Sequence, residues 1–598
     1  ASTCGFRFEI VDATVGANAA ITNFAVSNNS FQSITGEGIQ LLFGDATALD
    51  ETHTVQVIGN RFESVASGGT TNNAIYCQSN TRVQGLNITA NTFDTCGNSD
   101  SQSGIIEIQA GSASGFALSN ADVSRNQFNG CTGPAVFLTD YSAAATWTMR
   151  NIRVDGNSVQ SNIYTAIYLD LLAYTVAKSI SVSDNFISDV TGAANDTGIE
   201  VHSPTSAALL QTSICRNTIR TTGGGAAGAI TIDINDDVTN LAVDGNTIVG
   251  DLATEASIYI SVDGTWLHGS VDGNVVDNST KHGIFVDILA ADAVSGVTGL
   301  SMSNNKVRST AERGIFLQAD NNTSTPTVHA VAINNNVIEN AGTHGLRIDA
   351  LTGTDLRDIT VNGNTIHTTG AEGFYCDLSG ATDVWSLSVD GNNLTSLGGS
   401  GIRVGGPFYT GSLLSTSISN NTVMAAAEDG IAVLVTFGSA KSLQVSGNTV
   451  RNWSQAAGAV SYYGLTVQAG DWTASSVVGN TFRSNEQDAT GMHYLCTGTM
   501  VNCTVSTNTV FLTGVAGTQS MLFNGSGGGA TQTGLSITGN NFYGATAGVN
   551  YTGTFAPTRS QCSINLEQLT GAAAGNWGTG AGGFTLPFVT SVTVNNRD

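Results

Sequence analysis

The chain has 598 residues, of which 41% are apolar and only 11% are charged, and its net charge is −25. A surface this acidic repels phosphate backbones and anionic lipids, so the composition argues against nucleic-acid binding. No apolar run reaches the roughly 18 residues of a membrane helix, and we expect no membrane insertion. The apolar content is too high for a disordered chain, and we expect an extended core.

One short motif, apolar–x–small–Asn–x–apolar, recurs along the whole sequence, for example in "LAVDGNTIVG" from Leu241. The first and last copies lie 511 residues apart over 17 intervals, so the period is about 30 residues, which is typical of solenoids. In chain order the asparagines of the motif are Asn29, Asn60, Asn91, Asn126, Asn157, Asn185, Asn217, Asn246, Asn274, Asn305, Asn336, Asn364, Asn392, Asn421, Asn448, Asn480, Asn508 and Asn540.

The residue before this asparagine is usually Gly, Asn or Asp, which tolerate the left-handed backbone region. Each motif therefore predicts a strand, a sharp bend and a second short strand. A third strand follows after a loop and shows the period-two alternation of a half-buried strand. Clear copies of the third strand are expected over residues 38–43, 198–203, 283–288, 314–319, 345–350 and 430–435.

Three short strands per turn, with no amphipathic helix between them, predict an all-β fold. We expect a right-handed, single-stranded parallel β-helix of about 18 coils over residues 1–555. The repeated asparagine is predicted to lie inside the bend, where its amide bonds the backbone and stacks as an internal ladder. Residues 556–598 are expected to form a C-terminal tail or capping segment.

The "NN-x-I" and "GN-x-I" signatures of these repeats resemble the right-handed parallel β-helix superfamily, which has the pectate-lyase-like fold. The resemblance covers nearly the whole chain and implies the fold. It does not choose a function, because this scaffold carries lyases, glycosidases, epimerases, phage tailspikes and adhesins. Leucine-rich repeats also have an asparagine ladder, but their shorter period and leucine positions do not match.

Alternation places the second and fourth residues of each third strand on the outer face. Carboxylates and aromatic rings gather there, as a glycan groove would require. The candidate catalytic residues are Asp170, His202, Asp233, Asp287, Asp349 and Asp377. The candidate glycan-binding residues are Tyr168, Tyr259, Phe285, Phe316, Arg347, Tyr375 and Arg403.

Calcium is the only metal that the sequence suggests, and no other cofactor is required. Its candidate ligands are the side-chain oxygens of Asp233, Asn235, Asp236 and Asp237, which lie in one short acidic segment.

Two disulfide bonds are predicted. Cys96 and Cys131 each follow a ladder asparagine by five residues, so they should stack one turn apart. Cys496 and Cys503 flank a short loop. Together with the scarcity of lysine, these pairs favour an extracellular or cell-surface location.

The ends of the chain suggest an incomplete solenoid. Residues 5–9 match a third strand with no turn before it, and residues 591–598 match the start of a motif that does not finish. We expect either a piece of a longer chain or a subunit that associates head to tail into a filament.

These features favour a structural or adhesive protein that binds a polysaccharide or cell-surface glycan and is not an enzyme. The alternative is a glycoside hydrolase or polysaccharide lyase that acts through carboxylates on the exposed sheet. A trimeric phage tailspike is the third reading.

Overall fold

Every element of the described structure is a β-strand. The structure is a computed structural model, and its described part forms two units, 1–295 with 305–310 and 296–304 with 311–598. No helix among these residues is long and apolar enough to span a bilayer. The described residues are 4–9, 21–43, 51–66, 72–79, 82–97, 103–110, 117–140, 148–162, 164–171, 176–190, 197–203, 208–222, 228–251, 254–289, 296–320, 327–351, 353–381, 383–406, 408–454, 462–486, 489–513, 519–543, 547–555, 562–570 and 589–594.

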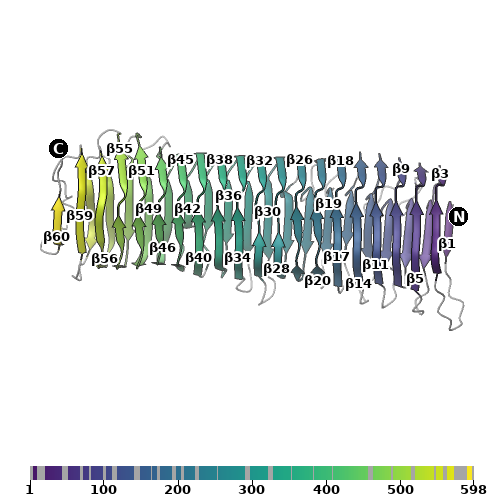
Figure 1. Cartoon of the computed structure of the whole chain (residues 1–598), viewed down its shortest axis with the longest axis horizontal. Coiled ribbons are helices and arrows are strands. Elements are labelled where there is room, and N and C mark those ends of the chain that lie inside the picture. The colour runs from purple at the N-terminus through teal and green to yellow at the C-terminus, as the bar shows by residue number, and fades with distance from the viewer. Residues whose placement is uncertain are drawn as a thin grey trace. The chain divides into compact units, whose positions relative to one another are not determined.

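A turn of the first unit shows how three strands make a coil. Strands β14 (Thr148–Asp155), β15 (Ser158–Gln160) and β16 (Ile167–Asp170) follow one another, and β17 (Val176–Ser183) then begins the next turn. Strand β14 pairs in parallel with β17, with Ile152 beside Ile180. Within each unit, equivalent strands of successive turns lie side by side in this way (Figure 1).

The third strands of the turns form one parallel sheet in each unit, and this sheet carries the candidate residues. In the first unit its strands are β1 (Phe6–Glu9), β4 (Ile39–Phe43), β7 (Ile75–Ser79), β10 (Ile106–Ala110), β13 (Val136–Asp140), β16, β19 (Ile199–Ser203), β23 (Ile230–Ile234), β27 (Ala256–Val262) and β30 (His282–Leu289). In the second unit they are β33 (Ile315–Asp320), β36 (Leu346–Ala350), β39 (Phe374–Asp377), β42 (Ile402–Gly406), β46 (Ile431–Lys441), β49 (Tyr463–Thr473), β52 (Thr490–Cys496), β56 (Gln519–Thr533) and β58 (Ala547–Phe555).

Two strands lie within the segment 556–598, which the sequence predicts to be a tail or cap. Strand β59 (Cys562–Thr570) pairs in parallel with β57 (Ser536–Tyr543), and β60 (Val589–Val594) pairs with β59. Parallel pairing therefore continues beyond residue 555. The rest of this segment lies outside the described residues.

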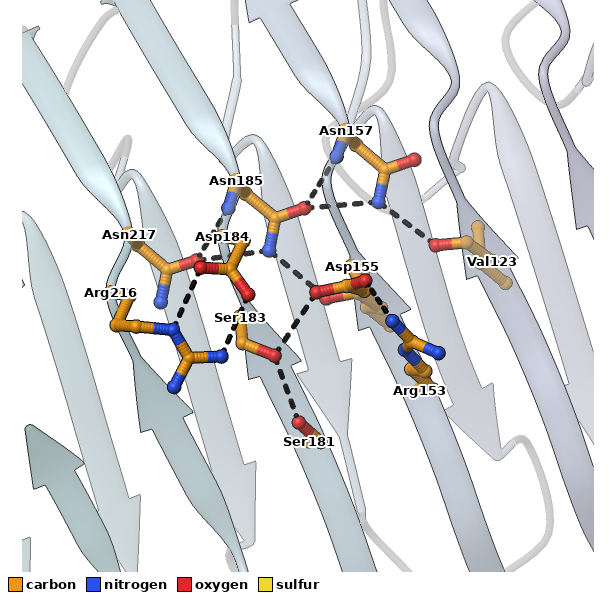
Figure 2. A network of polar contacts seen from close by, with 11 residues as sticks. Val123, Arg153, Asp155, Asn157, Ser181, Ser183, Asp184, Asn185, Arg216 and Asn217 are labelled. Carbon is orange, nitrogen blue, oxygen red and sulfur yellow. Dashed lines mark hydrogen bonds and ion pairs between the residues drawn. The ribbon is translucent and has the colours of Figure 1, made fainter.

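The asparagine ladder is present in both units, which confirms the prediction that the repeated amide bonds the backbone at the bend and stacks from turn to turn. The backbone N–H and the Nδ2 of Asn157 both donate to Oδ1 of Asn185, at 2.9 and 3.0 Å (Figure 2). Nδ2 of Asn157 also donates to the carbonyl of Val123 at 2.9 Å. Asn185 repeats these bonds with Asn217. Each amide thus joins its own bend to the turns on both sides.

The bend before each ladder asparagine is left-handed, as predicted, and glycine is not required there. Arg125 and Arg216 both have φ 56° at this position. Most of the described turns also contain two further left-handed corners, which were not predicted from the sequence. They lie six residues before and four residues after the ladder asparagine, for example at Asn151 (φ 54°) and Ser161 (φ 52°) around Asn157.

The all-β parallel solenoid is confirmed, but the expected number of coils is too high. The structure supports about 14 turns where 18 were predicted. The prediction counted ladder asparagines, and an asparagine marks only the corner between two strands. Many connections between the strands lie outside the described residues, so not every ladder asparagine belongs to a turn that is described in full.

The core is built from the apolar positions that flank the ladder. Two residues after each ladder asparagine, the side chain points inward, and in the first unit four of these residues form a stack of phenylalanine rings. Ring centroids are separated by 4.9 Å for Phe31–Phe62, 4.8 Å for Phe62–Phe93 and 4.7 Å for Phe93–Phe128. This spacing is that of the parallel strands themselves, about 4.8 Å, so the rings repeat with the coil.

Gly391 allows a test of the left-handed bend. It has φ 65°, and a Cβ added there would meet no heavy atom within 4 Å. Because Asn420 holds the same bend at φ 54°, we expect Gly391→Asn to change the free energy of unfolding by less than about 0.5 kcal/mol. Gly391→Val should cost about 2 kcal/mol, because a β-branched residue is strained at positive φ. Urea unfolding of both variants measures this, and equal losses would contradict it.

Candidate functional site

The third-strand sheet of the second unit brings several predicted residues into two rows. Parallel register places Phe316, Arg347, Tyr375 and Arg403 one after another. Beside them, Asp349 lies next to Asp377. We call the following group the Tyr375 cluster: His344, Arg347, Asp349, Glu372, Tyr375, Asp377 and Arg403.

Charged pairs hold the Tyr375 cluster together. Nε of Arg347 donates to Oδ1 of Asp349 at 2.6 Å, and its Nη2 donates to Oδ2 of Asp377 at 3.5 Å. On the next turns, Nη1 of Arg403 donates to Oε1 of Glu372 at 3.1 Å. The other oxygen of Glu372 lies 3.1 Å from Nε2 of His344. The arginines therefore lie in one row, between the row of Asp349 and Asp377 and the row of His344 and Glu372.

The Tyr375 ring lies between the two arginines and is not an open stacking surface. The guanidinium carbons of Arg347 and Arg403 lie 5.2 and 5.0 Å from its centroid, and the ring is 8% exposed. Arg313 covers Phe316 in the same manner, at 4.1 Å. The expectation of exposed aromatic faces is therefore wrong for these two rings, because cations from neighbouring positions cover them.

The carboxyl groups of the second unit differ in acidity. Burial raises the pKa of Asp349. Burial also acts to raise the pKa of Glu372, but the hydrogen bond and charge of His344 and the charge of Arg403 outweigh it and hold that pKa well below its usual value. Two turns further on, burial raises the pKa of Asp429 to about 6.

Two polar atoms of the Tyr375 cluster are buried without a hydrogen-bond partner. They are Nδ1 of His344 and Nε of Arg403. Buried polar groups nearly always have a partner in folded proteins, and an unpaired one costs about 1–3 kcal/mol. An oxygen-rich ligand could supply these missing partners.

A second polar group lies on the third-strand sheet of the first unit. Strand register places His202 between Asp170 and Asp233. Nδ1 of His202 is 3.4 Å from Oδ1 of Asp170, and this contact raises the pKa of His202. Glu200 accepts hydrogen bonds from the hydroxyls of Thr165 and Thr197, both at 3.3 Å, and burial raises its pKa.

The remaining predicted residues of the first unit are largely covered by their neighbours. Tyr168 stacks with Phe137 at 5.1 Å, and Tyr259 contacts Phe285 at 5.3 Å. Phe285 and Asp287 are both buried. Phe285, like Phe316 and Tyr375, therefore offers no exposed ring for a sugar to stack on.

His344 and Glu372 were not predicted as site residues from the sequence. Both directly precede the glycine that begins a third strand, 28 residues apart. Their side chains join the Tyr375 cluster although they lie outside the strand alternation. The repeated occurrence of a titratable residue directly before this glycine was the sequence pattern that could have identified them.

The predicted calcium ligands do not converge on one point. Asp233 lies on strand β23, whereas Asp236 and Asp237 lie in the turn after it. Oδ1 of Asp236 accepts a bond from the N–H of Asp237, and Oδ1 of Asp237 accepts one from the N–H of Thr265. Asn235 is exposed. Within the described part of the chain, no group of three or more His, Cys, Asp or Glu residues is placed to hold a metal ion, and calcium binding stays a prediction.

The four cysteines predicted to form disulfides are free thiols. Cys96 and Cys131 do stack on neighbouring turns, and the strand spacing of about 4.8 Å lies within the Cα–Cα range of a disulfide, but their sulfur atoms are not bonded to each other. Each thiol instead contacts a backbone carbonyl, that of Phe62 for Cys96 and that of Phe93 for Cys131. Cys496 and Cys503 contact the separate carbonyls of Gly470 and Trp472.

Solved structures similar to this chain include three polysaccharide-active proteins. The A-module of mannuronan C-5 epimerase AlgE6 from Azotobacter vinelandii is 13% identical, with 70% of this chain and 91% of that chain covered and a TM-score of 0.31. The catalytic unit of the GH87 α-1,3-glucanase from Streptomyces thermodiastaticus strain HF3-3 is 14% identical, with 65% and 62% covered and a TM-score of 0.27. The AlgE4 A-module of A. vinelandii is 13% identical, with 78% and 88% covered and a TM-score of 0.22. None of these likenesses assigns an activity to this chain.

The sequence has no match among curated proteins. Residues 293–470 match the family described as "Right handed beta helix region". With the parallel register and the asparagine ladder, this match identifies the fold of the chain as a right-handed parallel β-helix.

Proposed function

We propose that this chain is an extracellular or cell-surface β-helix of structural or adhesive type that binds a glycan at the Tyr375 cluster. The observation that carries the proposal is the set of paired charged side chains of the Tyr375 cluster, in which Nδ1 of His344 and Nε of Arg403 have no hydrogen-bond partner. Sugar hydroxyls both donate and accept hydrogen bonds, so one ligand class could serve both atoms.

The coil geometry also suits a polymer. Equivalent positions repeat about every 4.8 Å along the third-strand sheet. The charged groups from Arg347 to Arg403 therefore present donors and acceptors in an extended line. A glycan has hydroxyls spaced along its length and could follow such a line.

Arg403→Lys should weaken glycan binding by about tenfold or more. Lysine keeps a positive charge beside Glu372 but removes the planar guanidinium and its Nε donor, and a hydrogen bond to a charged group is worth about 1.5–3 kcal/mol. Affinity is measured by calorimetry with the full chain and a panel of polygalacturonate, hyaluronate, xylan and a soluble glucan.

The matched control is Arg451→Lys, because Arg451 is exposed on β48 (Thr449–Arg451), a strand of a different sheet. The Arg451→Lys variant should bind the glycan with the affinity of the wild type. The proposal is wrong if the wild type binds no glycan of the panel, or if both variants bind equally well.

Catalysis on a polysaccharide is the second candidate function, and the arrangement around His202 favours it. Asp170 and Asp233 lie two turns apart, so their backbones are separated by about 9–10 Å. This is near the carboxyl separation of about 6.5–9.5 Å in inverting glycosidases. Release of reducing ends or unsaturated products from the same panel would favour this candidate over a binding role.

A further inference from the structure

Two phenylalanines in the second unit are far more exposed than other large apolar side chains. Phe408 is 72% exposed and Phe437 is 66% exposed. Neighbouring exposed apolar groups often mark an interaction surface.

The two phenylalanines lie on neighbouring turns at one corner of the coil. The N–H of Phe437 donates to the carbonyl of Tyr409 at 3.2 Å. The corner is anchored from inside, because Tyr409 is fully buried and its hydroxyl donates to the carbonyl of Ser412 at 2.9 Å. The N–H of Phe437 thus bonds the residue that follows Phe408, so the two exposed side chains come from adjoining turns.

This corner adjoins the Tyr375 cluster. Phe408 follows the end of β42, five residues beyond Arg403. Phe437 lies where the register of β46 shifts, between Val435 and Ser439, just past the stretch that pairs with β42. The two rings lie off the line of charged groups, along the strand direction from Arg403, so a branch of the bound glycan would reach them.

The two segments that carry the rings have no charged side chain of their own, although Asp383 and Asp471 lie on the adjoining turns: Oδ1 of Asp383 accepts a bond from the N–H of Ser412 at 2.9 Å, and Asp471 pairs with Ser439. Residues 408–414 and 434–440 contain no charged side chain, although the chain has a net charge of −25. Gly438 lies directly against the neighbouring turn, since a Cβ there would be 1.8 Å from the carbonyl oxygen of Gly411. The surface beside Phe437 is therefore bare backbone with hydroxyl side chains, which suits the neutral C–H face of a sugar ring better than an ion.

We propose that Phe408 and Phe437 form an aromatic rim on which sugar rings of the glycan bound at the Tyr375 cluster stack. The inference rests on the proposed function and adds a specificity element to it. The charged cluster binds hydroxyl or carboxylate groups, and the rim selects sugars that present an unsubstituted apolar face.

The test uses the full chain with both Phe408→Ala and Phe437→Ala, and the same polygalacturonate, hyaluronate, xylan and soluble glucan. We expect affinity for the bound polysaccharide to fall by about tenfold, since aromatic contacts contribute about 0.5–1.5 kcal/mol each. Met424→Ala is the control, because Met424 is an exposed apolar residue on β45 (Thr422–Ala426), in another sheet. It should bind within twofold of the wild type, and both proteins should melt at the wild-type temperature.

The outcomes separate this inference from the proposed function. If Arg403→Lys weakens binding but the double phenylalanine variant binds as the wild type does, the rim proposal is wrong. The proposal of a glycan site at the Tyr375 cluster is then still supported. If the wild type binds no polysaccharide, both the aromatic rim and the proposed glycan site are wrong. Sedimentation velocity gives the last outcome: a wild-type dimer that the double variant converts to monomer would make the rim a contact between two copies and overturn the inference.

Discussion

Asn246→Ala is expected to lower the free energy of unfolding by about 3–5 kcal/mol. Oδ1 of Asn246 accepts two bonds from Asn217, both at 3.0 Å. Its Nδ2 donates to Oδ1 of Asn274 at 3.0 Å and to the carbonyl of Ile214 at 2.8 Å. Alanine removes all four bonds, and the groups left behind are buried where water cannot replace the amide.

The matched control is Asn129→Ala. Asn129 is exposed, and its Nδ2 makes one bond, to Oδ1 of Asp94 at 2.9 Å. We expect a change below about 0.5 kcal/mol, as for most surface substitutions. Urea unfolding followed by circular dichroism compares the two. Similar small losses would show that the ladder does not brace the corners.

The ladder could be predicted from the sequence because its hydrogen bonds are made by one residue type at a fixed position in each repeat. The short amide of asparagine accepts two bonds from the previous turn through one atom and donates two through the other, so asparagine recurs at a fixed period. The other two corners place no such demand. At Asp358 and Thr368, around Asn364, the chain adopts φ 53° and φ 58° without glycine. The packed coil imposes these conformations, and the local sequence gives little sign of them.

The sequence predicted which face of the sheet carries the candidate residues, but it did not predict which neighbouring side chains cover them. Alternation placed Arg347, Tyr375 and Arg403 on one face, because strand geometry fixes which side a residue faces. What covers a side chain depends on its neighbours in space. The sequence analysis expected Tyr375 to be open, but the two arginines lie over its ring. Phe408 and Phe437 were not singled out, because they lie at a corner where alternation does not apply.

Arg347→Ala is expected to lower the free energy of unfolding at pH 7 by about 2–4 kcal/mol, because it leaves the carboxylate of Asp349 unpaired in a buried position. The side chain of Arg347 is 18% exposed and that of Asp349 is 8% exposed. The control is Arg357→Ala. Arg357 also pairs with an aspartate two residues away, Asp355 at 2.9 Å, but its side chain is 50% exposed. That loss should stay below about 1 kcal/mol.

The pH dependence gives the sharper test. Burial already raises the pKa of Asp349 in the folded protein, so Asp349 stabilises the fold most below its unfolded pKa of about 3.9, and this contribution is lost as the pH rises through the folded pKa. Removing Arg347 raises the folded pKa further, so the gap between variant and wild type should be small near pH 4 and grow toward pH 7. Adding Asp349→Asn to Arg347→Ala should close most of the gap at pH 7. If it does not, the cost comes from lost packing of the guanidinium on Tyr375, and the carboxylate is not the cause.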